Sequence, residues 1–283
     1  WMVKVLGYHD AYASGVIHAV CGGFALGVLV VLGPRIGKFV NGEPQNIGPR
    51  NPWLVTLGLF LIYTGFWGFY AACNIPIFDA GADSGAGVTY FTATNIYAAP
   101  TTLSGVTMNF LMSLAGGLLA GYVVAKGDPF WTYSSGLAGI ICASAGNDLY
   151  HPLQSMVIAM VGVVIMYKLH YWVERRFKID DAVGAVAVHG YAGVVGLLIC
   201  GFVLWGYPSS TYEGYAAITP WGMLAGAIIM FGVLGFLPGY VIALILNSAG
   251  QLRIPREVEI AGQDYLAMEA AKKDENTVAS AEQ

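Results

Sequence analysis

The feature that most constrains this chain is a series of long apolar segments separated by short polar ones. A helix needs about 20 apolar residues to cross a bilayer. Lipid offers no partner to backbone N–H and C=O groups, so membrane-spanning segments without a closed barrel must be helical. The sequence predicts an all-α, polytopic membrane protein. Its seven transmembrane spans are expected at about 11–32, 53–73, 103–125, 133–146, 152–172, 185–206 and 221–248.

The composition agrees with this class of protein. Of the 283 residues, 57% are hydrophobic and only 11% are charged, whereas a soluble domain usually carries about 25% charged residues. We expect residues 1–250 to form the transmembrane domain and 251–283 a cytoplasmic tail with a partly disordered end. The fourth segment, rich in glycine and alanine, is short and is expected to pack inside the protein.

Several classes of function lack their signatures in the sequence. We find no P-loop, nucleophile elbow, zinc-protease motif or basic patch for nucleic acid. No CxxC pair occurs, which disfavours a zinc site. We therefore predict that the protein is not an enzyme and has no cofactor, no metal and no nucleic-acid partner. Free cysteines in apolar runs are usually buried, so burial is expected for Cys21, Cys142 and Cys200.

The lysines and arginines of the short loops predict the orientation in the membrane. Nine follow the first, third, fifth and seventh segments, and a tenth, Lys168, lies near the end of the fifth; none follows the second, fourth or sixth, and only Lys4 lies on the other side. Basic loops stay in the cytoplasm. The sequence thus predicts a multi-pass protein of the cell (plasma) membrane, with the amino end of this chain outside and the carboxyl end in the cytoplasm.

Two histidines occur in one unusual arrangement. Asp10 precedes His18 by eight positions, as Asp181 precedes His189. Eight residues of helix span about 12 Å, so both imidazoles are expected at membrane depth, where an ionisable residue is a candidate functional group. The alternative is a neutral imidazole that bonds a nearby backbone carbonyl. Paired imidazoles could line a narrow passage and relay protons.

The aspartates and the neighbouring aromatic residues also allow two interpretations. Asp10 and Asp181 are first of all candidate helix N-caps, and their charge near membrane depth would also favour a cation. Phe69, in "GFWGFY", could plug a pore, flank it or simply pack. The remaining histidines lie near segment ends, where interfacial or solvated roles are expected: His9, His151 and His170.

Five stretches together resemble the ammonium transporter (Amt/Rh) family, on its Amt side. "DAYASGVIHAVCGGFALGVLVVLGPRIGKF" is similar to the family's fifth span and the GPRxG loop that follows. "IYTGFWGFYAAC" resembles the sixth span, "GLAGIICASAG" the short eighth and "DDAVGAVAVHG" the start of the tenth. "LRIPREVEIAGQD" resembles the tail pattern R-(V/I)-x4-E-x-x-G-x-D. The matches run in the family's order.

This resemblance implies a homotrimer with one hydrophobic pore per subunit, which conducts ammonium or ammonia across the lipid membrane. His18 and His189 would be the twin histidines of the pore, and Phe69 the inner gating phenylalanine. Family tails dock a trimeric PII signalling protein. The residues that could contribute to such docking here are Arg253, Glu257, Gly262 and Asp264.

The chain also departs from the family pattern. The family has eleven spans in an inverted repeat, and this sequence begins at the fifth. The simplest account is that it is the later portion of a longer polypeptide, and a separate complementing subunit is the alternative. Tyr70 replaces an expected asparagine and Cys73 an expected serine, which predicts an altered recruitment site because a thiol accepts hydrogen bonds weakly.

Three functions follow for comparison. The first is ammonium transport past His18 and His189. The second, motivated by Tyr70 and Cys73, is an ammonium-sensing or regulatory subunit with little flux. The third is a structural partner in a larger membrane complex, which is favoured only if the chain is natively seven spans.

Overall fold

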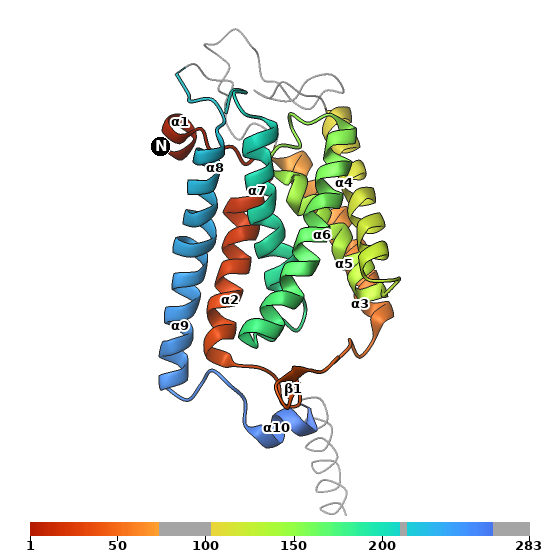
Figure 1. Cartoon of the computed structure of the whole chain (residues 1–283), viewed down its shortest axis with the longest axis vertical. Coiled ribbons are helices and arrows are strands. Elements are labelled where there is room, and N and C mark those ends of the chain that lie inside the picture. The colour runs from red at the N-terminus through yellow and green to blue at the C-terminus, as the bar shows by residue number, and fades with distance from the viewer. Residues whose placement is uncertain (74–102, 210–213, 263–283) are drawn as a thin grey trace, which may run out of the picture.

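The computed structural model describes residues 1–73, 103–209 and 214–262 (Figure 1). Within these ranges nearly all regular structure is helical, and two-residue strands β1 and β2 pair as an antiparallel hairpin. Three π-helical segments, η1 to η3, continue directly into α-helices. The elements are α1 (Met2–Leu6), η1 (Ser14–Ala19), α2 (Val20–Leu32), β1 (Phe39–Val40), β2 (Glu43–Pro44), α3 (Pro52–Ala72), α4 (Leu103–Val124), α5 (Pro129–Ser144), α6 (Pro152–Phe177), η2 (Val186–Tyr191), α7 (Ala192–Val203), α8 (Pro220–Ala227), η3 (Ile228–Phe236), α9 (Leu237–Ser248) and α10 (Arg256–Ala261).

The long helices run side by side along the molecule, with α10 beneath one end (Figure 1). In the described ranges, six helical stretches are long and apolar enough to cross a membrane. The remaining predicted span, the fourth, at 133–146, corresponds to α5, which has 16 residues and is buried along most of its length. The all-α polytopic architecture is confirmed, as is the internal position of the short fourth segment. A count of seven spans stays a prediction.

Helix starts follow from capping side chains. Asn51 accepts hydrogen bonds from the first backbone N–H groups of α3, Asp128 from one in α5 and Thr219 from one in α8. Each is followed by proline, which lacks the N–H that a helix's first residue would leave unpaired. The polar loops therefore end where the apolar helices begin.

Glycines let the two histidine-bearing stretches approach closely. A methyl group added at Gly22 would lie 2.1 Å from the backbone nitrogen of Gly190, and one added at Gly193 would lie 2.3 Å from the carbonyl oxygen of Ser14. Both distances are far below van der Waals contact. The stretch η1–α2 and the stretch η2–α7 thus meet backbone to backbone, as small residues allow in membranes.

The cysteine prediction is correct in part. Cys142 and Cys200 are buried, but Cys21 is exposed in this chain. Cys21 lies on α2, whose outward face carries apolar side chains. Residues of a membrane helix that face lipid are apolar, like those that face the protein interior. The apolar residues around Cys21 in the sequence therefore did not show that its side chain is buried.

The crossing of η1–α2 and η2–α7 predicts a strong effect of Gly22→Ala. The added methyl has only backbone to push against, and overpacking of a tight contact typically costs about 1–3 kcal/mol. Thermal unfolding of the detergent-solubilised protein should begin at lower temperature. Gly58→Ala is the matched control, since nothing lies within 4 Å of its added methyl. Equal melting temperatures for the two variants would contradict the close crossing.

Candidate functional site

The two histidines predicted from the D-x7-H spacing meet in the structure. His18 lies in η1 and His189 in η2, and their Nδ1 atoms are 3.0 Å apart. The rings stack with centroids 5.2 Å apart and planes 14° apart. Both side chains are half-buried. The sequence places the residues 171 positions apart, and the glycine crossing brings them into contact.

This contact constrains the protons on the pair. A hydrogen bond between two Nδ1 atoms needs one proton, so one ring donates and the other accepts. The Nε2 atom of His18 is buried without a hydrogen-bond partner in the described part of the chain. A ring nitrogen of this kind, beside a second imidazole, can accept a proton from a small solute or donate one to it. The pair is therefore able to bind a small polar solute and relay its proton.

Asp10 and Asp181 hold the starts of the two histidine-bearing segments. Oδ2 of Asp10 accepts hydrogen bonds of 2.9 Å from the backbone N–H of Gly15 and Val16. Oδ2 of Asp181 accepts one of 2.9 Å from Ala187. Neither aspartate occupies the N-cap position, which falls to alanine in both segments. The carboxylates nevertheless satisfy first-turn N–H groups, as the capping interpretation requires.

A phenylalanine that the sequence reasoning missed touches the pair. The ring of Phe66 lies edge-on to His18, with centroids 5.2 Å apart, and is buried. The predicted gate residue, Phe69, packs on Phe66 at 5.7 Å, one helical turn further along α3. The signal was present in "FWGF", since residues three apart lie on one helix face. Phe66 thus contacts both His18 and the predicted gate residue.

The predicted recruitment residues Tyr70 and Cys73 lie in different surroundings. Tyr70 is fully buried, stacks on Tyr12 at 4.0 Å and hydrogen-bonds Ser144 and Asn147 at 2.6 and 3.0 Å. Cys73 ends α3 and is exposed. The altered recruitment site predicted from these two residues stays a prediction. Tyr70 is part of a buried polar network, which satisfies its hydroxyl.

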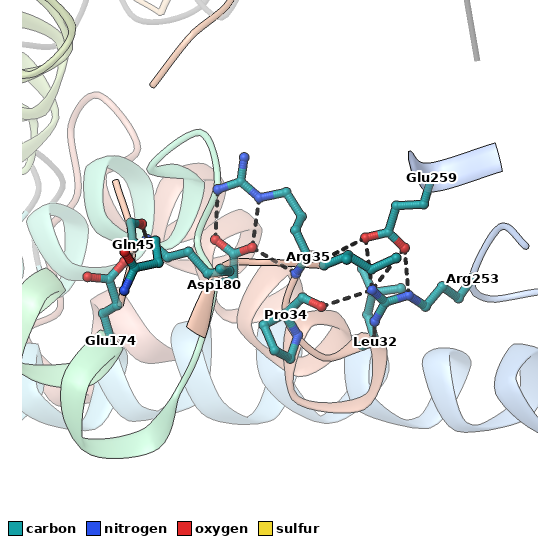
Figure 2. Close-up of polar contacts among 10 residues, drawn as sticks. Leu32, Pro34, Arg35, Gln45, Glu174, Asp180, Arg253 and Glu259 are labelled. Carbon is teal, nitrogen blue, oxygen red and sulfur yellow. Dashed lines mark hydrogen bonds and ion pairs between the residues drawn. The ribbon is translucent and has the colours of Figure 1, made fainter. Parts of the chain in front are cut away.

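At the opposite end from α1, a group of ion pairs joins three segments (Figure 2). Arg35 binds Asp180 in a bidentate manner, at 2.7 and 2.9 Å. Lys38 lies 2.5 Å from Glu174, and both are buried. Although burial opposes ionisation of Asp180, hydrogen bonds from Arg35 hold the pKa of that carboxyl below its usual value. We call these four residues the inner ion-pair cluster.

A cavity of about 680 Å³ lies beside the inner ion-pair cluster. Its wall includes all four cluster residues together with Trp131, His170 and Asp181. The ring of His170 is buried, and its Nδ1 lies 3.7 Å from Oδ2 of Asp181. The solvated role expected for His170 is therefore wrong, because the ring packs edge-on to Trp131 at 4.7 Å.

The profile of the Ammonium Transporter Family matches residues 1–273 of the chain. The chain belongs to the ammonium transporter family. It is 27% identical to ammonium transporter Amt1 and 29% identical to Amt2, both of Methanocaldococcus jannaschii, over 95% and 98% of its length. These matches cover 63% and 60% of the two relatives, so the chain spans about 60% of their length.

Solved structures of the family share the fold. A structure titled "Sensor Amt Protein" superposes with a TM-score of 0.73 at 25% identity, covering 93% of this chain and 60% of that one. The Rh50 protein of Nitrosomonas europaea gives a TM-score of 0.62 at 18% identity, covering 95% of this chain and 66% of that one. The recognition of an Amt-type membrane fold from sequence is confirmed.

The family's tail pattern is partly visible in the structure. Arg253 donates to the backbone carbonyls of Leu32 and Pro34 and pairs with Glu259 (Figure 2). Glu259 also accepts a 2.8 Å hydrogen bond from the N–H of Ile36. This glutamate, rather than the predicted Glu257, occupies the glutamate position of the pattern.

The other two predicted tail residues are Gly262 and Asp264. Gly262 follows α10 with a φ of +86°, a conformation that favours glycine. Asp264 lies outside the described residues. The N–H of Ile36, together with Arg253, lowers the pKa of Glu259 below its ordinary value.

The contacts of Glu259 predict that it fastens the tail. Glu259→Ala removes the partner of Arg253 and of the Ile36 N–H, so trypsin should cleave after Arg253 and Arg256 faster than in the unchanged protein. Glu257→Ala is the matched control, and its cleavage rate should stay as before. Since the pKa of Glu259 is lowered, its stabilisation of the tail contact is fully present above the usual glutamate pKa and is lost as pH falls through the lowered value. Equal cleavage of the two variants would contradict this role.

Proposed function

We propose that the chain forms part of a conduit that carries ammonium or ammonia across the cell membrane. The observation that carries this proposal is the contact of His18 with His189 between apolar helices. A cation in such a passage loses its hydration at high free-energy cost. Ammonium that gives up a proton before entry would pass as ammonia, with the paired imidazoles as its hydrogen-bond partners.

The finer features of the assembly belong to the same proposal. We propose a homotrimer in the plasma membrane, with the inner ion-pair cluster and the tail on the cytoplasmic side, since the basic loops gather there. Arg253 and Glu259 shape the surface on which a PII signalling protein would dock. The Asp10 and Asp181 carboxylates hold the two imidazoles in place through the backbone.

The sensing alternative is not favoured. It rested on Tyr70 and Cys73 as a weakened capture site for ammonium. Tyr70 is buried and hydrogen-bonds Ser144 and Asn147, which supports a packing role for this residue.

The transport proposal predicts the effect of His189→Ala. Loss of one imidazole breaks the shared hydrogen bond and leaves His18 alone in the passage, so saturable ammonium uptake should fall at least tenfold. Uptake is measured with the protein in proteoliposomes under an ammonium gradient. His151→Ala is the control, because His151 is exposed and caps α6. Unchanged uptake in His189→Ala would remove the support for this conduit.

The two phenylalanines are expected to separate packing from gating. Phe66 is buried and contacts four rings (His18, Phe69, Tyr70 and Phe110). Phe66→Ala should therefore reduce the free energy of unfolding by about 3–5 kcal/mol, as large-to-small changes in a core do, and lower the melting temperature. Phe69→Ala should alter uptake more than stability if Phe69 is the gate. Comparable losses of folded protein for both variants would assign Phe69 to packing.

A further inference from the structure

His9 connects three separate segments at the end of the bundle that lies opposite the inner ion-pair cluster. Its Nε2 lies 3.0 Å from Oδ1 of Asp148, which follows α5. Its Nδ1 lies 3.2 Å from the carbonyl oxygen of Ser209, which follows α7. Its backbone N–H donates to the sulfur of Met223 in α8. The side chain is buried, contrary to the solvated role expected from the sequence.

The two oxygen partners determine how many protons this ring needs. A backbone carbonyl and an ionised carboxylate can only accept hydrogen bonds, so both ring nitrogens must donate. A neutral imidazole has one donor and would turn a lone pair toward one of these oxygens. The pair of His9 and Asp148 therefore holds one proton more than a neutral ring beside a carboxylate does.

We propose that His9 is a positioning residue whose imidazolium fastens the outer end of the conduit and makes its geometry depend on pH. His9 is joined directly to Asp10, and Asp10 holds the N–H groups of Gly15 and Val16 at the start of η1. This turn carries His18 toward His189. The contacts of His9 with Asp148 and Ser209 thus hold the start of η1, the segment that carries His18.

The charged surroundings of His9 set the direction of the pH dependence. Burial alone would lower its pKa, but the carboxylate of Asp148, the Ser209 carbonyl and the more distant Asp10 raise the pKa above its usual value. From α8 the thioether of Met223, which is uncharged, accepts the backbone N–H of His9. A raised pKa means that this contribution to stability is fully present below the ordinary histidine pKa and is lost as pH rises through the raised value.

Asp148→Asn tests the proton directly. The asparagine has nearly the same shape, and its amide can donate to a neutral Nε2 while Nδ1–H still donates to Ser209. The contacts are kept without the extra proton. Melting temperatures of the purified protein, measured over about pH 5–9 around the histidine titration range, should decline with rising pH in the unchanged protein and lose this decline in Asp148→Asn.

Two further variants complete the test. His9→Gln removes one of the two ring contacts and should melt at lower temperature at acidic pH, without the decline. His151→Gln removes an exposed histidine and should keep the decline of the unchanged protein. Equal pH profiles for the unchanged protein and Asp148→Asn would overturn the proposal.

Nitrogen-15 NMR of histidine-labelled protein reports the protonation state independently. We expect both nitrogens of one ring to remain protonated at neutral pH. This signal should be absent in His9→Gln, and in Asp148→Asn it should be replaced by that of a neutral ring. A His9 ring that is neutral at pH below its ordinary pKa would contradict the proposal. The consequence for uptake rests on the proposed function, whereas melting and NMR do not. Failed uptake with a protonated His9 would overturn only the transport function.

Discussion

The backbone contact between η1–α2 and η2–α7 is the constraint on which the rest of the structure depends. Gly22 meets Gly190, and Gly193 meets the carbonyl of Ser14, at distances that leave no room for a methyl group. Larger residues would hold the two stretches apart, and the imidazoles of His18 and His189 could not share a hydrogen bond. Dispersion between closely packed backbones replaces the hydrophobic effect that lipid cannot supply, and the contact between the two imidazoles is its consequence.

Pairs of ionisable side chains lie at both ends of this apolar bundle. At one end Arg35 and Lys38 pair with Asp180 and Glu174, and at the other His9 pairs with Asp148. Charges buried among helices are costly unless they are paired and hydrogen-bonded. Each of these pairs joins segments far apart in sequence, so the same contacts that neutralise the charges also hold the loops in register.

The sequence predicts the parts of the structure that depend on local pattern. Hydropathy locates the long helices, and the repeated D-x7-H spacing selects His18 and His189. Contacts between distant segments could not be predicted this way. The burial of His9 depends on residues near 148, 209 and 223, and the burial of Tyr70 depends on the loop after α5. A residue near the end of a segment is exposed only if no other segment covers it. Which segments cover it cannot be predicted from a single sequence.

The shape of the two histidine-bearing turns explains why each needs an aspartate upstream. In a π-helical turn the N–H bonds the carbonyl five residues back, as His18 bonds Ala13, so the wider first turn leaves N–H groups without helical partners. Asp10 takes those of Gly15 and Val16, and Asp181 takes that of Ala187. In both segments a residue six positions after the aspartate is bound, and the histidine comes two positions later. The D-x7-H spacing is therefore a geometric unit, in which a carboxylate stabilises an irregular turn that α-helical bonding alone would not hold.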